Sequence, residues 1–427
     1  MAERSGGGAA GRGASRPAWR RALTRNVVWL GVVSFFADVS SEMLYPLMPI
    51  FLTVTLGAPV AVVGIIEGAA EAMASLLKTV SGRIADRTGR RVELVFGGYS
   101  ISALAKPIIA LAHAWPLVLF ARVLDRTGKG FRGSPRDAII ADSAPADASG
   151  AAFGWHRAMD TLGAVVGPLL ALGLLALVHE DLRLVIGLAA IPGVIGALLV
   201  LGVSDPRRRG VKPGRGDATK PKAAGPRLET VASARLSWSA LPARFRAYLA
   251  AWLPFVLVNS SDVFLILRAK QLGFSTTAVV LLYVLYNVFY AAASLPFGHL
   301  SDRIGRRGVL VMGMVVFAVV YAGFALATSP WHIAALFAVY GLYIAATDGV
   351  GKAFAVDLVP GELRATSVGL LGTLTGIFTL LASALAGVLW DTVGPWAPFA
   401  LGAAGAVASA LLFAFLPGLH ARANVEV

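Results

Sequence analysis

A charged decapeptide occurs twice in this chain. Residues 82–91 read GRIADRTGRR and residues 298–307 read GHLSDRIGRR, so both copies follow the pattern G-x-x-x-D-R-x-G-R-R. Each copy lies between two long apolar runs, and a charged residue at the centre of a membrane costs about 2.5–3.5 kcal/mol. Each copy is therefore predicted to form a water-facing turn between two membrane helices. Because the copies start 298 − 82 = 216 residues apart in a chain of 427, we expect two related halves.

The composition points to a membrane protein that crosses the bilayer many times. Hydrophobic residues make up 57% of the chain and charged residues only 15%, against about 25% in an ordinary soluble domain. The absence of cysteine excludes disulfides and thiolate metal sites, and we expect no metal or other cofactor. The net charge of +14 is attributed to loop lysines and arginines that set topology, so no nucleic-acid partner is expected.

Twelve apolar segments are long enough to cross a membrane, since a spanning helix needs about 20 mostly apolar residues. We predict an all-α membrane protein with twelve transmembrane helices in two pseudosymmetric six-helix bundles, residues 26–203 and 247–417. Residues 204–246 read as a basic linker, and residues 1–25 and 418–427 as tails. The twelve segments are 26–54, 60–81, 92–113, 115–142, 151–178, 183–203, 247–270, 276–298, 308–328, 332–356, 366–390 and 396–417.

The distribution of positive charge predicts the orientation. The N-terminal tail, the central linker and the loops on their side hold most of the lysine and arginine, and such loops stay in the cytoplasm. Both termini and both decapeptides are therefore expected to be cytoplasmic, in a multi-pass protein of the cell inner (plasma) membrane. The N-terminus has no apolar stretch before Val27, so no cleaved signal peptide is expected.

The decapeptide resembles the motif between helices 2 and 3 of the major facilitator superfamily (MFS), whose degenerate repeat lies between helices 8 and 9. The resemblance covers about residues 26–417 and implies a substrate site between the two halves near the midplane. It also implies a conformational switch in which Asp86 faces the start of helix 11 near Arg364 and Asp302 faces the start of helix 5 near Gly150. A pure topology signal is the alternative. The switch residues are Gly82, Asp86, Arg87, Gly89, Arg90, Gly298, Asp302, Arg303, Gly305 and Arg306.

The fourth apolar segment is unusually charged. At about 100° per residue, the seven charged residues from Arg122 to Asp137 fall within an arc of roughly 140°, which suits a watery cavity or polar interface and not lipid. Arginine binds carboxylate and phosphate well, so this face predicts anion recognition; internal pairing with acids of neighbouring helices is the alternative. The candidate substrate contacts are Arg122, Arg126 and Lys129 here, with Asp262, Tyr286 and Asn287 in the second half.

Four carboxylates on the first two predicted helices are candidates for proton coupling. They are two pairs, each one helical turn apart: Asp38 with Glu42, and Glu67 with Glu71. A low-dielectric site raises the pKa of a carboxyl group and a nearby arginine lowers it, so movement of the cation can switch protonation. Permanently ionised structural pairs are the alternative.

Three residues of the fifth segment bear on the direction of transport. Gly163, Gly167 and Pro168 resemble the core of a motif typical of MFS antiporters, in which small residues allow close helix packing. We therefore expect a proton-coupled secondary transporter of a small organic solute, working as a monomer by alternating access among membrane lipids. Export by antiport is favoured.

The sequence leaves two alternatives to export by antiport. Uptake of an organic anion or a siderophore-like metal chelate by symport is the alternative that the helix 4 cations favour. A non-transporting receptor is the more distant one. An enzyme is not expected, because no nucleophile–base or metal-ligand arrangement appears, and the phosphate-binding loop of an ATP-driven pump is absent.

Overall fold

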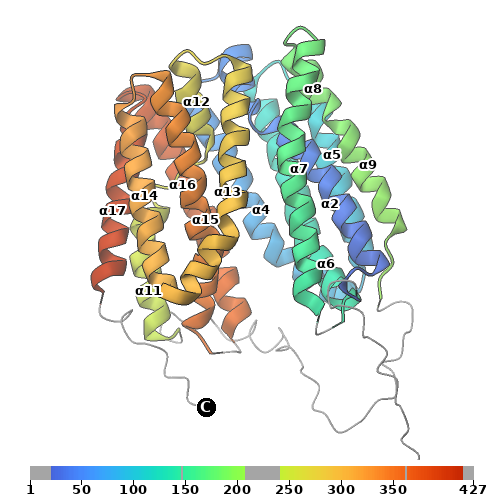
Figure 1. Ribbon diagram of the computed structural model, residues 1–427. Helices are drawn as coiled ribbons and strands as arrows, with labels where there is room; N and C mark the ends of the chain where they lie inside the picture. Colours follow the sequence, from blue (N-terminus) through green and yellow to red (C-terminus); the bar gives the residue numbers. More distant parts are fainter. Residues whose placement is uncertain (1–20, 146–147, 207–240, 361–362, 417–427) are drawn as a thin grey trace, which may run out of the picture.

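The computed structural model describes residues 21–145, 148–206, 241–360 and 363–416, and within these ranges the chain forms helices and no strands. The helices form two groups that stand side by side, the first blue to green and the second yellow to red (Figure 1). The predicted C-terminal tail, and most of the predicted N-terminal tail and linker, lie outside the described residues. We call the side where α2 begins and α17 ends the terminal side, and the other the opposite side.

The first half makes six crossings. α2 continues into α3 and a π-helical turn, and α8 continues into α9, so each of these runs counts as one crossing. The elements are α2 (Arg25–Leu44), α3 (Met48–Ile50), the π-helical turn (Phe51–Thr55), α4 (Val60–Thr88), α5 (Arg91–Ala110), α6 (Trp115–Ser143), α7 (Ser149–Leu177), α8 (Leu182–Leu188) and α9 (Ala190–Leu199).

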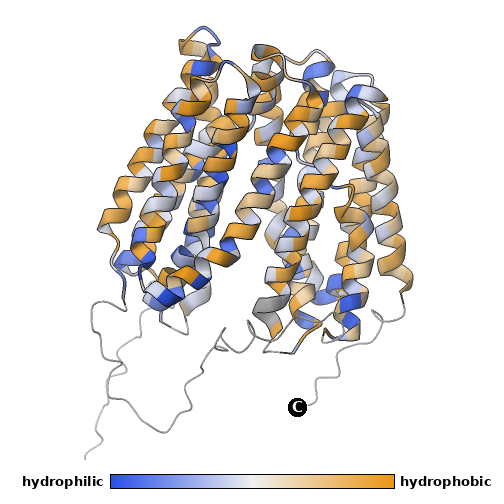
Figure 2. Ribbon diagram, turned by 180° about the vertical axis from the view of Figure 1, so that it is seen from behind, coloured by the Kyte–Doolittle hydropathy of each residue, from blue (hydrophilic) through white to orange (hydrophobic). Residues whose placement is uncertain are grey.

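The second half repeats the arrangement, with its first crossing split in two between residues 257 and 262. The elements are α11 (Ala243–Val256), α12 (Val263–Gln271), α13 (Thr276–Ile304), α14 (Arg306–Leu326), α15 (Pro330–Asp357), α16 (Arg364–Thr392) and α17 (Ala397–Phe415). Ten spans in the described chain are long and apolar enough to cross a membrane. The other two predicted crossings are α6, which is too charged, and the interrupted pair α11–α12. Most positions along the helices are apolar (Figure 2), and large apolar side chains such as Leu177, Leu295 and Val319 are exposed, as expected for contact with lipid.

The decapeptide is more helical than predicted. Residues 82–88 continue α4 and residues 298–304 continue α13, so the prediction that all ten residues form a turn was wrong. The chain turns at the second glycine of each copy: Gly89 has φ +62° and Gly305 has φ +91°. Glycine adopts these angles without the Cβ clash of other residues, which explains its place in the pattern. The preceding charged residues simply carry the helix out into water.

Ion pairs hold each decapeptide against its own half. Arg91 lies 2.6 Å from Asp142 at the end of α6 and 3.5 Å from Asp86. In the second half, Arg306 lies 3.1 Å from Asp357 at the end of α15. The side chains of residues 364–366, where Asp86 was expected to bind, lie outside the described part of the chain. The switch contact therefore stays a prediction.

The halves pack tightly against each other on the opposite side. A Cβ added to Gly64 of α4 would lie 2.1 Å from the carbonyl oxygen of Ser383 on α16, and one added to Gly387 would lie 2.5 Å from Ala61 Cα. Asp391 Oδ2 accepts a hydrogen bond from the backbone N–H of Ala61 (2.8 Å) at the start of α4. The backbones of α4 and α16 thus meet directly at this end.

Candidate substrate cavity between the halves

A cavity of about 1300 Å³ lies between the halves. Its walls come from α2, α4, α6 and α7 on one side, and from the α11–α12 break, α13, α15 and α16 on the other. It reaches toward the terminal side, where Lys78 and Ser134 face Lys352 and Val356. Because α4 and α16 are in backbone contact at the other end, the cavity opens toward the terminal side.

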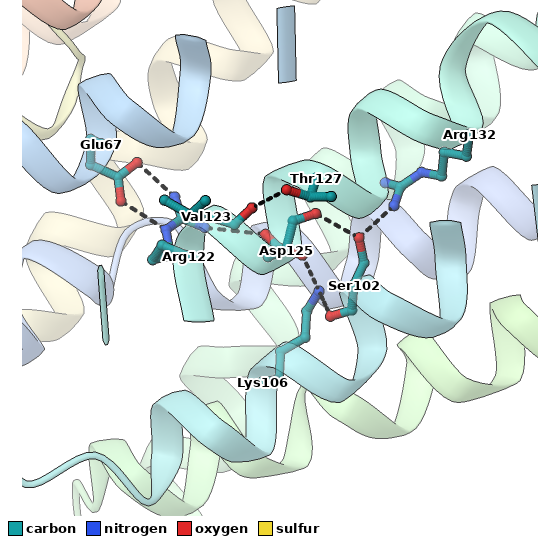
Figure 3. A network of polar contacts seen from close by, with 8 residues as sticks. All are labelled: Glu67, Ser102, Lys106, Arg122, Val123, Asp125, Thr127 and Arg132. Carbon is teal, nitrogen blue, oxygen red and sulfur yellow. Dashed lines mark hydrogen bonds and ion pairs between the residues drawn. The ribbon is translucent and has the colours of Figure 1, made fainter. Parts of the chain in front are cut away.

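A buried ionic network lies within the first half (Figure 3). Arg122, 1% exposed, donates two hydrogen bonds to Glu67 on α4, from Nε at 2.9 Å and from Nη2 at 2.6 Å. Its Nη1 lies 3.4 Å from Asp125, which lies 3.0 Å from Lys106 on α5. Paired charges can be buried at tolerable cost, whereas unpaired ones cannot. For Arg122 the structure thus has the internal pairing that the sequence left open as an alternative.

The network continues beyond Asp125 through a serine that sequence reasoning missed. Ser102 Oγ donates to the carbonyl oxygen of Asp125 (2.9 Å) and accepts from Arg132 Nη1 (2.8 Å). The Arg132 guanidinium also lies over the ring of Tyr99, 4.3 Å from its centroid. Arg132 and Glu67, the two ends of the network, both line the cavity. Lys106, a lysine inside an apolar segment, was the signal that could have revealed the network from sequence.

The other two candidate cations of α6 have no such partners. Arg126 is 7% exposed, and its Nε is buried without a hydrogen bond to any described residue. Lys129 is exposed to the cavity, with no acid of the described chain within 4 Å of its Nζ. Glu71 of α4 also lines the cavity, and Arg126 and Lys129 are the cations that interact with it most strongly. The three groups are close enough to interact without forming a fixed pair.

The two candidate acids of α2 also line the cavity and differ from each other. Glu42 accepts a hydrogen bond from the hydroxyl of Tyr283 on α13, which links the halves. Asp38 has no hydrogen bond or ion pair with a described residue; Asp160 and Lys129 are among its electrostatic neighbours. Of the four proton-coupling candidates, Glu67 and Glu42 therefore have fixed partners, whereas Asp38 and Glu71 do not.

The candidates of the second half gather near the interruption between α11 and α12. Asp262 Oδ1 accepts a hydrogen bond from the Tyr340 hydroxyl (2.6 Å) and Oδ2 accepts one from the Tyr286 hydroxyl (3.2 Å). Asn287 lines the cavity and donates to the Tyr283 carbonyl oxygen (3.0 Å). Tyr340 was not predicted. Its signal was a phenol within an apolar segment, because a buried tyrosine hydroxyl usually finds a partner.

A further polar link between the halves lies nearer the terminal side. Arg157 Nη2 of α7 donates to the Tyr290 hydroxyl (2.6 Å), which donates to Asp348 of α15 (3.3 Å). These residues come from three helices, so spacing within any one helix does not connect them. Gly163 and Gly167 lie elsewhere, where α7 meets the backbone of α2, and Pro168 is buried beside them.

Comparison with known proteins identifies the fold. The family profile of the Major Facilitator Superfamily matches residues 30–267 and 248–426. An uncharacterised MFS-type transporter of Methanocaldococcus jannaschii is 34% identical over 402 residues, covering 93% of this chain and 96% of the relative. A multi-drug resistance efflux pump PmrA homologue of Lactococcus lactis is 25% identical, covering 87% and 89%. Among solved structures, the nucleoside transporter NupG superposes with a TM-score of 0.72 at 14% identity, covering 93% of this chain and 100% of that one.

These matches extend over both halves and agree with the two six-helix groups, the central cavity and the repeated decapeptide. The predicted family and twelve-helix fold are confirmed, and so is the prediction that the chain is not an enzyme. The chain is a multi-pass membrane protein that belongs to the Major Facilitator Superfamily of transporters.

Proposed function

We propose that this protein is a proton-coupled secondary transporter that moves a small organic solute across the cell inner membrane by alternating access. With both termini in the cytoplasm, as the lysine and arginine distribution predicts, the cavity opens to the cytoplasm. Both walls of the cavity come from one chain, so we expect a monomer to be sufficient. Its partners are then the solute, protons and the surrounding lipids.

The observation that carries the proposal is the pair of unpaired carboxylates on the cavity wall, Asp38 and Glu71. Ionisable groups inside a membrane protein are costly, and acids without a fixed cation are suited to gain and lose a proton during transport. Both acids interact electrostatically with the ammonium group of Lys129. Movement of Lys129 or Arg126 between the acids would therefore change which of them is protonated.

Two observations support export by antiport. A relative covering most of this chain is named as a drug efflux pump homologue. In addition, α7 contacts α2 through Gly163 and Gly167, the glycines of the antiporter-like pattern. This close contact would let α7 and α2, both of which line the cavity, move together when the halves rock.

Uptake of an organic anion or a metal chelate by symport is the second candidate. It is favoured by Arg126, a mostly buried guanidinium whose Nε has no partner among the described residues. A carboxylate or phosphate of a solute could satisfy that group, with Lys129 nearby as a second cation.

The proposal is tested in proteoliposomes that carry a pH gradient and an internal pH-sensitive dye. Pools of lipophilic cations and organic anions are added in turn. We expect a solute that dissipates the gradient and loss of this response in Asp38→Asn or Glu71→Gln, while Glu180→Gln, an exposed acid outside the cavity, leaves it intact. The absence of solute-dependent proton movement with every pool, or an unchanged response in both variants, would refute coupling at these acids.

A further inference from the structure

The two walls of the cavity are charged in different ways. On the first-half wall, five acids and five cations line the cavity: Asp38, Glu42, Glu67, Glu71 and Asp160, with Lys78, Lys129, Arg132, Arg136 and Arg157. On the second-half wall, Asp262 has no cationic side chain within 4 Å among the described residues. The balance of charge is therefore neutral on one side and negative at Asp262 on the other.

The groups around Asp262 do not neutralise it. Those of its own half are phenols, and those facing it from α2 and α4 are a phenol and two acids. They are Tyr286, Tyr321, Tyr340 and Tyr343 in the second half, and Tyr45, Glu42 and Glu71 in the first.

Nearby cations of the second half are occupied elsewhere. Arg268, two turns along α12, donates to the carbonyl oxygens of Phe324 and Ala327 at the end of α14. Lys352 is paired with Asp348.

Asp262 retains capacity to bind a further donor. Each carboxylate oxygen has one tyrosine donor in the structure, at 2.6 and 3.2 Å, and each can accept about two hydrogen bonds. The side chain is partly exposed and lines the cavity. It stands just before α12, so the break in the crossing places the carboxylate at the cavity wall.

Aromatic rings continue from Asp262 along the same wall. Tyr340 and Tyr343 have ring centroids 5.2 Å apart, Tyr343 and Phe255 5.9 Å, and Phe255 and Trp252 5.3 Å. All four residues line the cavity, as does Tyr45 opposite. Ring faces attract cations and provide apolar contact area, and a carboxylate beside such rings suits a charged amine with a hydrophobic body.

We propose that the solute is a lipophilic organic cation, which binds with its charge at Asp262 and its apolar body along Tyr340, Tyr343, Phe255 and Trp252. The proposal deepens the transport function given above and rests on it. A proton and the cation would compete for this carboxylate, which would weaken cation binding at low pH, while Asp38 and Glu71 remain the acids that carry the coupled proton. The drug efflux pump relative agrees with this class of solute.

The test compares two probes of equal shape and opposite charge, tetraphenylphosphonium and tetraphenylborate. Binding of each radiolabelled probe is measured on the purified full-length protein in nanodiscs, with empty nanodiscs as the blank. We expect saturable binding of tetraphenylphosphonium only. As the pH is lowered into the range where protons compete for the site, the affinity for tetraphenylphosphonium should fall by roughly tenfold per pH unit. Asp262→Asn should weaken binding about tenfold or more and remove its pH dependence, while Glu180→Gln, an exposed acid outside the cavity, should not.

A second pair of variants keeps the test valid if Asp262→Asn does not fold. Tyr340→Phe retains the ring and loses only the hydroxyl, whereas Tyr340→Leu removes the ring face. We expect binding to survive the first change and to weaken several-fold with the second. Equal affinity in wild type and Asp262→Asn, or binding of tetraphenylborate that is lost in Arg126→Gln, would overturn the proposal.

These results are separable from the transport proposal. Proton movement driven by an anionic pool, without tetraphenylphosphonium binding, would leave coupling intact and overturn the cation site. Binding at Asp262 without proton movement for any solute would support the cation site and overturn proton coupling.

Discussion

Gly64 offers a direct way to shift the balance between the two open states. It lies on α4 where α4 meets α16, and a Cβ there would be 2.1 Å from the carbonyl oxygen of Ser383. That oxygen belongs to the backbone of α16, so Gly64→Ala must push the two helices apart. Overpacking of this kind costs about 1–3 kcal/mol. The cost falls only on the state in which these ends are closed.

The magnitude can be worked through to an observable. A shift of 1–3 kcal/mol changes an equilibrium by about 5–150-fold. If the two states are equally populated in the wild type, the fraction open to the terminal side falls from one half to between about one-sixth and about one in 150. Gly372→Ala is the matched control on α16, because its added Cβ meets nothing within 4 Å and its position lines the cavity.

Cysteine labelling measures this shift, because the chain contains no cysteine of its own. A single Val356→Cys on the terminal-side wall of the cavity is reacted with a membrane-impermeant maleimide in vesicles of known orientation. We expect slower labelling with Gly64→Ala and unchanged or faster labelling with Gly372→Ala. Equal labelling rates in a folded Gly64→Ala protein, or equal slowing in both variants, would refute the argument that backbone contact at Gly64 holds this state.

Three further changes test other contacts. Glu67→Gln leaves Arg122 buried without its main counter-ion, so we expect about 3–5 kcal/mol of destabilisation, read as a lower midpoint of thermal unfolding; an unchanged midpoint would mean that water reaches Arg122. Gly89→Ala forces a left-handed backbone at φ +62° and should cost about 1–2 kcal/mol, while Gly97→Ala, a helical glycine with open space, should be neutral or stabilising in the same melt. Asp391→Ala removes a carboxylate from the N-terminus of α4 and should disfavour the terminal-side-open state by about 0.3–1 kcal/mol; spin-label distances across the opposite side should lengthen on average, and no change would exclude this cap as a latch.

Much of the fold follows from hydropathy, because the bilayer requires one long apolar segment for each crossing. The exceptions arise where hydropathy does not report helix geometry. Residues 82–88 are charged, yet they extend α4 beyond the apolar region. The matching serine pairs Ser40–Ser41 and Ser260–Ser261 behave differently, because α2 is continuous at the first pair whereas the helix is interrupted at the second. Each serine pair is followed by an acid, Glu42 or Asp262, so this short pattern alone does not determine whether the helix continues.

The candidate site was predictable as a set of residues but not as a set of partners. The period of α6 placed its cations on one face, and that face does lie toward the cavity and the network. However, Arg122 and Arg126 lie one turn apart and differ in their partners. Glu67 pairs with Arg122, whereas no described residue pairs with Arg126. The partner comes from another helix, so spacing within one helix cannot reveal it. Asp262 was predicted as a substrate contact, but its tyrosine surroundings come from α13 and α15.

The buried network also constrains how the chain can enter the membrane during synthesis. Taken alone, α6 carries too many charged residues for an apolar membrane span, and each of its central charges would cost about 2.5–3.5 kcal/mol in hydrocarbon. Glu67, which pairs with Arg122, and Lys106, which pairs with Asp125, lie on α4 and α5, which precede α6 in the chain and are apolar enough to span the bilayer. We therefore expect insertion of α6 into the membrane to depend on its contacts with α4 and α5. In chains truncated after α6, glycosylation mapping should show that Glu67→Leu combined with Lys106→Leu reduces its insertion, whereas Leu104→Ala, an exposed position, should have no such effect.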